Sequence, residues 1–152
     1  MIPTRKYFTD ENAAINYLER LRWPNGPICP HCGSKDRSGR LNGVRSKPSK
    51  KTPRGPARRG LWKCYAPHCR KQFTVLVKTR LQDLHMPLNK LLLAIYLLCF
   101  SKGTITGHRL SEALEINYRS AWRLAELIRA HAAVQTPRTF AKTLKSLARL
   151  QQ

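Results

Sequence analysis

The sequence predicts an α+β fold of two small modules, in which a cysteine-rich, partly β-structured module precedes a mainly helical one. Three observations support this prediction. Two cysteine pairs, Cys29 with Cys32 and Cys64 with Cys69, flank a segment rich in proline and glycine. The segment 72–77 after the second pair is β-branched and aromatic, as in strands. Beyond Pro87, apolar residues recur at helical spacing.

The N-terminal segment predicts a helix that begins near residue 10. Thr9 or Asp10 can accept hydrogen bonds from free backbone N–H groups, and Glu11 suits the positive end of the helix dipole. Apolar residues then recur at helical spacing, and the segment 23–27, with two prolines and a glycine, ends the helix. The side chains expected to form a small core against the cysteine module are Tyr17, Leu18, Leu21 and Trp23.

The cysteine pairs have the spacing of a metal site. Four thiolates can surround one ion as a tetrahedron, with about 2.3 Å per Zn–S bond and no open catalytic position. Zinc suits an all-thiolate set best, so one structural zinc ion is expected. Replacement of one thiolate by His31 or His68, and a pair of disulfides, stay open as alternatives. Cys99, on the most apolar helix, is expected to be an ordinary buried thiol. The expected ligands are Cys29, Cys32, Cys64 and Cys69.

A strand before the second cysteine pair and a strand after it would form the β-hairpin of a zinc ribbon. The first strand would lie at 61–63 and the second at 72–77. We expect Trp62 and Phe73 to cover the metal site rather than to stack on nucleobases. Structural zinc contributes about 10–16 kcal/mol to a small module, which can hold a ribbon that has little core.

The composition of segment 34–60 predicts that it is a long, basic, flexible loop without regular structure. Nine basic residues and no acidic residue lie between Arg40 and Lys63. Like charges held in one loop favour contacts with phosphates, which give affinity without sequence preference. A solvated insertion without a partner is the alternative. The residues expected to contact phosphates are Arg45, Lys50, Lys51, Arg54, Arg58 and Arg59.

The second module predicts three helices. The first begins at Pro87 and ends at Lys102-Gly103. A short helix at 106–114, a turn, and a helix at 118–130 capped by Asn117 then form a helix-turn-helix arrangement. The inner face of the last helix is expected to consist of Ala121, Trp122, Ala125, Leu127 and Ile128.

The outer, N-terminal part of that last helix is expected to reach base edges in the DNA major groove, where arginine can pair with guanine. A solvated basic face is the alternative. The residues expected at the bases are Tyr118, Arg119, Ser120 and Arg123.

The net charge of +21 predicts a polyanionic partner, and double-stranded DNA is the first candidate. An anionic membrane surface and a ribosome-like role come next. The most apolar run has ten residues, whereas a spanning helix needs roughly 20. Neither a secretory signal nor a spanning segment is recognisable, so a cytoplasmic, nucleoid-associated protein is expected. A basic amphipathic tail at 134–152 is expected to pack on the body or to mediate homo-oligomer or partner contacts.

Several runs in this order resemble the zinc-ribbon transposases of bacterial insertion sequences. The resemblance covers roughly residues 7–133. The runs that carry it include Arg22-Trp23-Pro24-Asn25-Gly26-Pro27-Ile28-Cys29-Pro30-His31-Cys32-Gly33-Ser34, Gly60-Leu61-Trp62-Lys63-Cys64, Cys69-Arg70-Lys71-Gln72-Phe73-Thr74-Val75 and Ser120-Ala121-Trp122-Arg123.

The resemblance implies the DNA-recognition region of a transposase, with domains at 1–82 and 83–133. In the relatives, such a region precedes a catalytic domain with acidic metal ligands, which has no expected counterpart here. The second cysteine pair is also more widely spaced than is usual, and Lys78 stands where glycine is typical. None of the acidic residues falls on predicted strands that could converge on two metal ions, so no enzymatic activity is expected.

Several functional alternatives remain at this stage. The chain could be a truncated or frameshifted remnant of a transposase, or a free-standing protein that occupies element ends and represses transposition. It could instead be a transcriptional regulator or RNA-binding module unrelated to DNA recombination. A protein-assembly module that uses the zinc ribbon and the tail is a further alternative.

Overall fold

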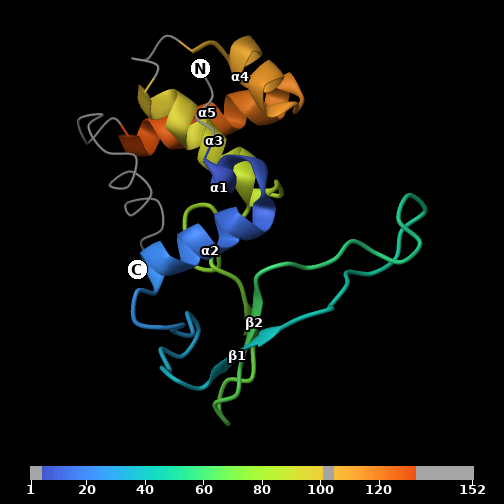
Figure 1. Cartoon of the computed structure of the whole chain (residues 1–152), viewed down its shortest axis with the longest axis vertical. Coiled ribbons are helices and arrows are strands. Elements are labelled where there is room, and N and C mark those ends of the chain that lie inside the picture. The colour runs from blue at the N-terminus through green and yellow to red at the C-terminus, as the bar shows by residue number, and fades with distance from the viewer. Residues whose placement is uncertain (1–4, 101–104, 133–152) are drawn as a thin grey trace.

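The computed structural model describes residues 5–100 and 105–132. Helices gather at one end of the molecule and a small sheet lies at the other, with one helix between them (Figure 1). The sheet has three strands in the order β1-β2-β3. The elements are α1 (Lys6–Thr9), α2 (Glu11–Arg22), β1 (Ser38–Leu41), β2 (Leu61–Cys64), β3 (Gln72–Phe73), α3 (Leu88–Phe100), α4 (Gly107–Leu114) and α5 (Tyr118–Ala132).

Helix α2 begins as predicted, with Asp10 rather than Thr9 as its cap. The Asp10 carboxylate accepts hydrogen bonds from the backbone N–H groups of Asn12 and Ala13, at 3.3 and 3.1 Å. The buried side of α2 carries Ala14, Ile15 and Leu18. Helix α1 was not predicted, because four residues are too few to show a helical repeat.

The β-hairpin of the ribbon is confirmed, and it gains a third strand. β2 pairs antiparallel with β3, so that Trp62 lies opposite Phe73. The predicted strand at 72–77 was too long, because β3 ends at Phe73 and turns follow it. The turns are closed by a hydrogen bond from the Val77 N–H to the Thr74 carbonyl, at 3.2 Å.

The segment 34–60 contains regular structure, contrary to the prediction. β1 pairs antiparallel with β2, and Ser38 lies opposite Cys64. Residues 42–60, called the arm below, then run out and back as two antiparallel lengths of chain that project from the sheet (Figure 1). Gly55 has a φ of +66° and lies directly against the Ser46 backbone, so a side chain there would collide. The proline and glycine residues of the arm are therefore compatible with a paired hairpin.

Helix α2 contacts the sheet on one side and, on the other, the layer formed by α3, α4 and α5, called the helical layer below. The Arg22 guanidinium donates hydrogen bonds to the carbonyl oxygens of Val75 and Val77, the second at 2.9 Å. The Trp23 ring lies perpendicular to Phe73, with centroids 5.7 Å apart. On the other side, α1 and α2 pack against α3. The predicted core role of Leu18 and Trp23 is confirmed, since both side chains are buried.

Helix α3 packs against α4 and α5, and its residues 91–95 are all buried. Its predicted end at Lys102-Gly103 and the predicted tail at 134–152 lie outside the described residues. The buried side chains form one cluster that extends from α1 and α2 to α5. No helix within residues 5–100 and 105–132 is long and apolar enough to cross a membrane.

Helices α4 and α5 lie where the sequence predicts them. The Thr106 hydroxyl caps α4 by accepting from the Arg109 N–H, at 3.4 Å, and Asn117 Oδ1 accepts from the Ser120 N–H at the start of α5, at 2.8 Å. The prediction of an inward-facing Trp122 was wrong, because this side chain is 50% exposed. The buried stripe of α5 consists of Ala121, Leu124, Ala125 and Ile128.

Candidate metal centre and nucleic-acid surfaces

The four predicted ligand cysteines come from two turns that face each other. The first turn lies between α2 and β1, and the Gly33 N–H closes it by donating to the Cys29 carbonyl at 2.8 Å. In the second, which follows β2, the Cys69 N–H donates to the Ala66 carbonyl at 3.0 Å. The structure brings together the Sγ atoms of Cys29, Cys32, Cys64 and Cys69, all within 4.8 Å of one another.

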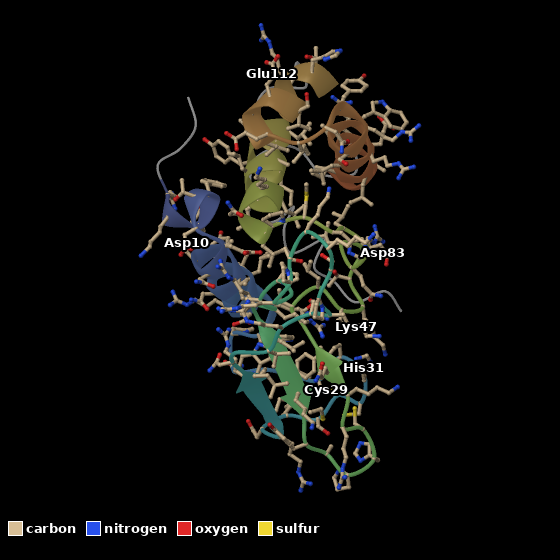
Figure 2. The ribbon with its side chains drawn as sticks, turned by 90° about the vertical axis from the view of Figure 1, so that its right-hand side faces the viewer. Asp10, Cys29, His31, Lys47, Asp83 and Glu112 are labelled. Carbon is tan, nitrogen blue, oxygen red and sulfur yellow. The ribbon has the colours of Figure 1, made fainter. Side chains whose placement is uncertain are left out.

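The sulfur positions fit a tetrahedral zinc ion. At about 2.3 Å per Zn–S bond, the sulfurs of such a site lie about 3.8 Å apart. The Sγ atoms of Cys29 and Cys69 are 3.8 Å apart, and those of Cys32 and Cys64 are 3.7 Å apart. All four cysteines are free thiols, so the disulfide alternative is wrong. The ligand group within the described chain includes neither His31, which lies beside Cys29 in Figure 2, nor His68.

The thiols differ in how readily they ionise. Burial raises the pKa of Cys29 to about 12 and also raises the pKa of Cys64. The Cys32 Sγ lies 3.3 Å from the Ser34 hydroxyl oxygen, and hydrogen bonding with the Ser34 side chain and backbone lowers the pKa of Cys32 to about 5. A bound zinc ion removes the proton from each coordinating thiol, so the ion supplies the positive charge that the buried sulfurs need.

All six basic residues predicted to contact phosphates lie exposed on the arm. Arg45 donates to the Gly55 carbonyl at 3.1 Å and so supports the arm itself. Arg59 is paired with Glu11 of α2, at 3.2 Å. The remaining four make no ion pair with any residue that the structure describes. These are Lys50, Lys51, Arg54 and Arg58.

The residues predicted to reach base edges are gathered at the start of α5, and all are exposed. Sequence reasoning missed two neighbours of this group. Trp122 lies one turn after Tyr118 and is half exposed. His108 of α4 stacks on the Tyr118 ring, with centroids 4.6 Å apart and an angle of 29° between the planes. The exposed group itself is Tyr118, Arg119, Ser120 and Arg123.

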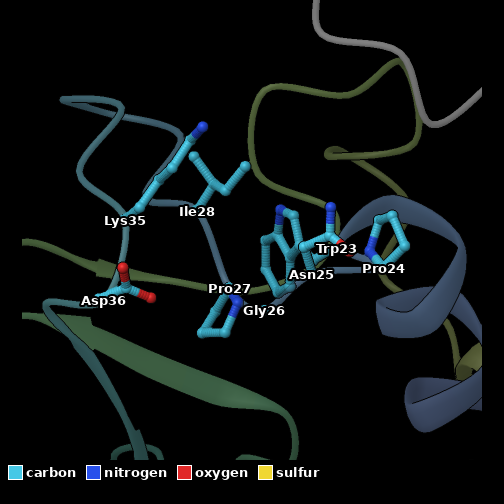
Figure 3. A pocket seen from close by; sticks show the side chains of 8 residues that line it. All are labelled: Trp23, Pro24, Asn25, Gly26, Pro27, Ile28, Lys35 and Asp36. Carbon is cyan, nitrogen blue, oxygen red and sulfur yellow. The ribbon is translucent and has the colours of Figure 1, made fainter.

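Two hollows lie near the ribbon. One, of about 200 Å³, lies between the end of α2 and the first cysteine turn, with Trp23, Pro24 and Asn25 on one side and Lys35 and Asp36 on the other (Figure 3). The second, of about 190 Å³, lies where the arm leaves the sheet. It was not predicted, and four arginines are among the residues that line it, namely Arg40, Arg45, Arg58 and Arg59.

Comparison with known protein families identifies a match for the cysteine module. Residues 9–72 match the family model of the transposase zinc-ribbon domain. This range contains α2, β1, β2, the arm and all four cysteines, and it ends at the first residue of β3. No curated protein and no solved structure matches the chain. The four-cysteine cluster within a zinc-ribbon domain is therefore the site of one structural zinc ion.

Proposed function

We propose that this chain is a zinc-dependent DNA-binding protein, the DNA-recognition portion of a transposase. One observation carries the proposal: a zinc-held sheet of the transposase zinc-ribbon type presents a cationic arm. The arm holds seven Lys and Arg residues and no acidic residue. Its free cations have no described acidic partner, so they are available to DNA phosphates, which are the counter-charges that such a surface fits best.

In this proposal the two modules have different roles. The ribbon module, residues 1–82, binds the DNA backbone through Arg45, Lys50, Lys51, Arg54, Arg58 and Arg59. The helical module, residues 83–133, works as a helix-turn-helix whose α5 enters the major groove. There, Arg119 and Arg123 pair with guanine edges while Tyr118 and Ser120 make further base contacts. The tail at 134–152 provides the contact with a second copy or a partner. The protein acts at the bacterial nucleoid and performs no chemistry itself.

The arm's role is tested by comparing two variants that lose the same positive charge, one on the arm and one elsewhere on the surface. One variant combines Lys50→Gln, Lys51→Gln, Arg54→Gln and Arg58→Gln. A control variant removes the same charge from exposed positions elsewhere, with Lys6→Gln, Arg20→Gln, Lys78→Gln and Arg80→Gln. Binding of each to a fluorescent duplex is titrated at several salt concentrations.

Each lost phosphate contact flattens the log–log salt slope by about 0.9, so the arm variant should lose about 3 to 4 units of slope. The control should change little. Equal losses in both variants would mean that only net charge matters, and the arm would have no special role. Preference for the flanks of the chain's own gene over a scrambled duplex would support recognition of element ends, and equal affinity would contradict it.

A further inference from the structure

Helix α5 exposes two large aromatic side chains on one side. Tyr118 is 48% exposed and Trp122 is 50% exposed, one helical turn apart. The Trp122 indole has neither a hydrogen bond nor a ring contact with any residue that the structure describes. A half-exposed tryptophan beside a second exposed ring is a surface that a ligand would cover favourably.

The two rings differ in how they are held. His108 stacks on Tyr118, and Gly107 lies so close that a Cβ there would be 2.8 Å from the Tyr118 ring. Tyr118 is therefore fixed against α4, with one ring face covered. Trp122 has no such neighbour among the described residues, so its indole presents an open apolar surface on this side of α5.

The charges around the indole favour DNA as its ligand. Arg119 and Arg123 are also one turn apart on the exposed side, and neither makes an ion pair with a described residue. Two acidic residues of this region are already paired, Glu126 with Arg129 and Glu115 with Lys90, both at 3.8 Å. An apolar ring on the same helix as two exposed arginines that are unpaired among the described residues matches a major groove, where the thymine 5-methyl group is the apolar feature among polar edges and phosphates.

We propose that Trp122 is a further base-contacting residue of α5, and that its indole packs against the 5-methyl group of a thymine. The inference rests on the proposed function and deepens it, because it assigns one base preference to one side chain. His108 and Gly107 act as positioning residues, since they fix Tyr118 and so keep the space beside the indole open. A covered Tyr118 face argues against a platform for successive unpaired bases, which needs open ring faces.

The test begins with selection of bound sequences from a random duplex pool. The full chain, Trp122→Ala and the control Tyr65→Ala are selected in parallel, because Tyr65 is an equally exposed ring on the ribbon, 56% exposed. We expect one thymine position to be enriched by the full chain and by Tyr65→Ala, and to become neutral with Trp122→Ala. Zinc content and circular dichroism of Trp122→Ala should equal those of the unaltered chain.

Replacing that thymine with uracil then removes only the methyl group. The full chain should bind the uracil duplex about fourfold more weakly, the effect of one buried methyl group, and Trp122→Ala should bind both duplexes equally. The same base preferences with and without Trp122, no uracil effect, or tighter binding of single strands would overturn the inference alone. Failure of the full chain to enrich any sequence would overturn the proposed sequence recognition itself.

Discussion

The zinc ribbon and the helical layer reach stability by different means. The ribbon has strands of four, four and two residues, and its centre is the four-cysteine cluster. The helical layer instead buries a continuous set of aliphatic side chains on α3, α4 and α5. Because an ion replaces much of the apolar core, the ribbon can carry a long cationic arm without losing its fold. The described residues of the helical layer include no such metal-ligand cluster, and its central helix, α3, is correspondingly apolar.

The claim that zinc stabilises the ribbon is wrong if the ribbon can fold without the ion. Cys64→Ser removes a buried ligand and should abolish the roughly 10–16 kcal/mol that structural zinc contributes. Zinc content should fall to zero and the amide signals of the sheet should collapse, while signals from α4 and α5 persist. Cys99→Ala is the matched control, since Cys99 lies outside the cluster, and it should retain one zinc ion. Native sheet signals in Cys64→Ser would refute this account of the ribbon.

Acid should release the same ion. Zinc binds thiolates, so protons compete with the ion for the sulfurs as the pH falls, and burial, which raises the pKa of Cys29 and of Cys64, favours their protonated forms. Hydrogen bonds with Ser34 lower the pKa of Cys32 to about 5 and so favour the thiolate that zinc needs. A chromogenic chelator measures the zinc released at each pH. Ser34→Ala removes a hydrogen bond to the Cys32 thiolate, so its release curve should shift to higher pH. An unchanged curve would count against that hydrogen bond.

The helical layer should respond to lost volume, not to metal. Leu110→Ala truncates a fully buried side chain of α4 and should lower the free energy of unfolding by about 2–5 kcal/mol. Zinc content should stay at one ion per chain. Chemical denaturation followed by circular dichroism measures the change, with the exposed Glu112→Ala on the same helix as control. Loss of zinc in Leu110→Ala would show that the two regions are not separable in this way.

A substitution at the junction between the two regions should have an intermediate effect on the free energy of unfolding. Arg22→Met removes the guanidinium that donates to the Val75 and Val77 carbonyls, which should cost about 1–3 kcal/mol. Arg20→Met, on the exposed side of α2, should cost less. Unfolding is followed by tryptophan fluorescence, which reports Trp23 beside the ribbon. Equal effects of the two substitutions would mean that the carbonyl contacts do not stabilise the junction.

The smallest effect is expected at the base of the arm. Glu11→Gln breaks an exposed ion pair with Arg59, and such pairs contribute about 0–1 kcal/mol. Stability should barely change, whereas DNA affinity at low salt should rise because Arg59 becomes available to phosphate. A thermal melt and a binding titration measure the two effects. Weaker DNA binding would show that the pair positions the arm.

Elements with a long periodic pattern, and the metal site with its repeated cysteine spacing, could be predicted from the sequence. The cysteine spacing predicted the metal cluster, and helical periodicity predicted α2, α3, α4 and α5. The short elements were missed, because β1 and α1 have four residues each and contain too few repeats. Trp122 was misplaced because tryptophan is usually buried, although the stripe through Ala121, Leu124, Ala125 and Ile128 already fills the inner face. The convergence of four arginines at the arm's base depends on long-range pairing that no local pattern reveals.

Helix α2 has a consequence for the spacing between the two DNA segments that the protein is proposed to bind. It contacts the ribbon through Arg22 and through Trp23 at its C-terminal end, and it packs against α3, so the ribbon and α3 are connected by direct packing. Its 12 residues make a strut about 18 Å long. A rigid strut of this kind sets a fixed phase between two points on a double helix. Under the proposed function, inserting half a helical turn between the DNA segments bound by the arm and by α5 would rotate one of them to the opposite side, beyond the reach of the protein.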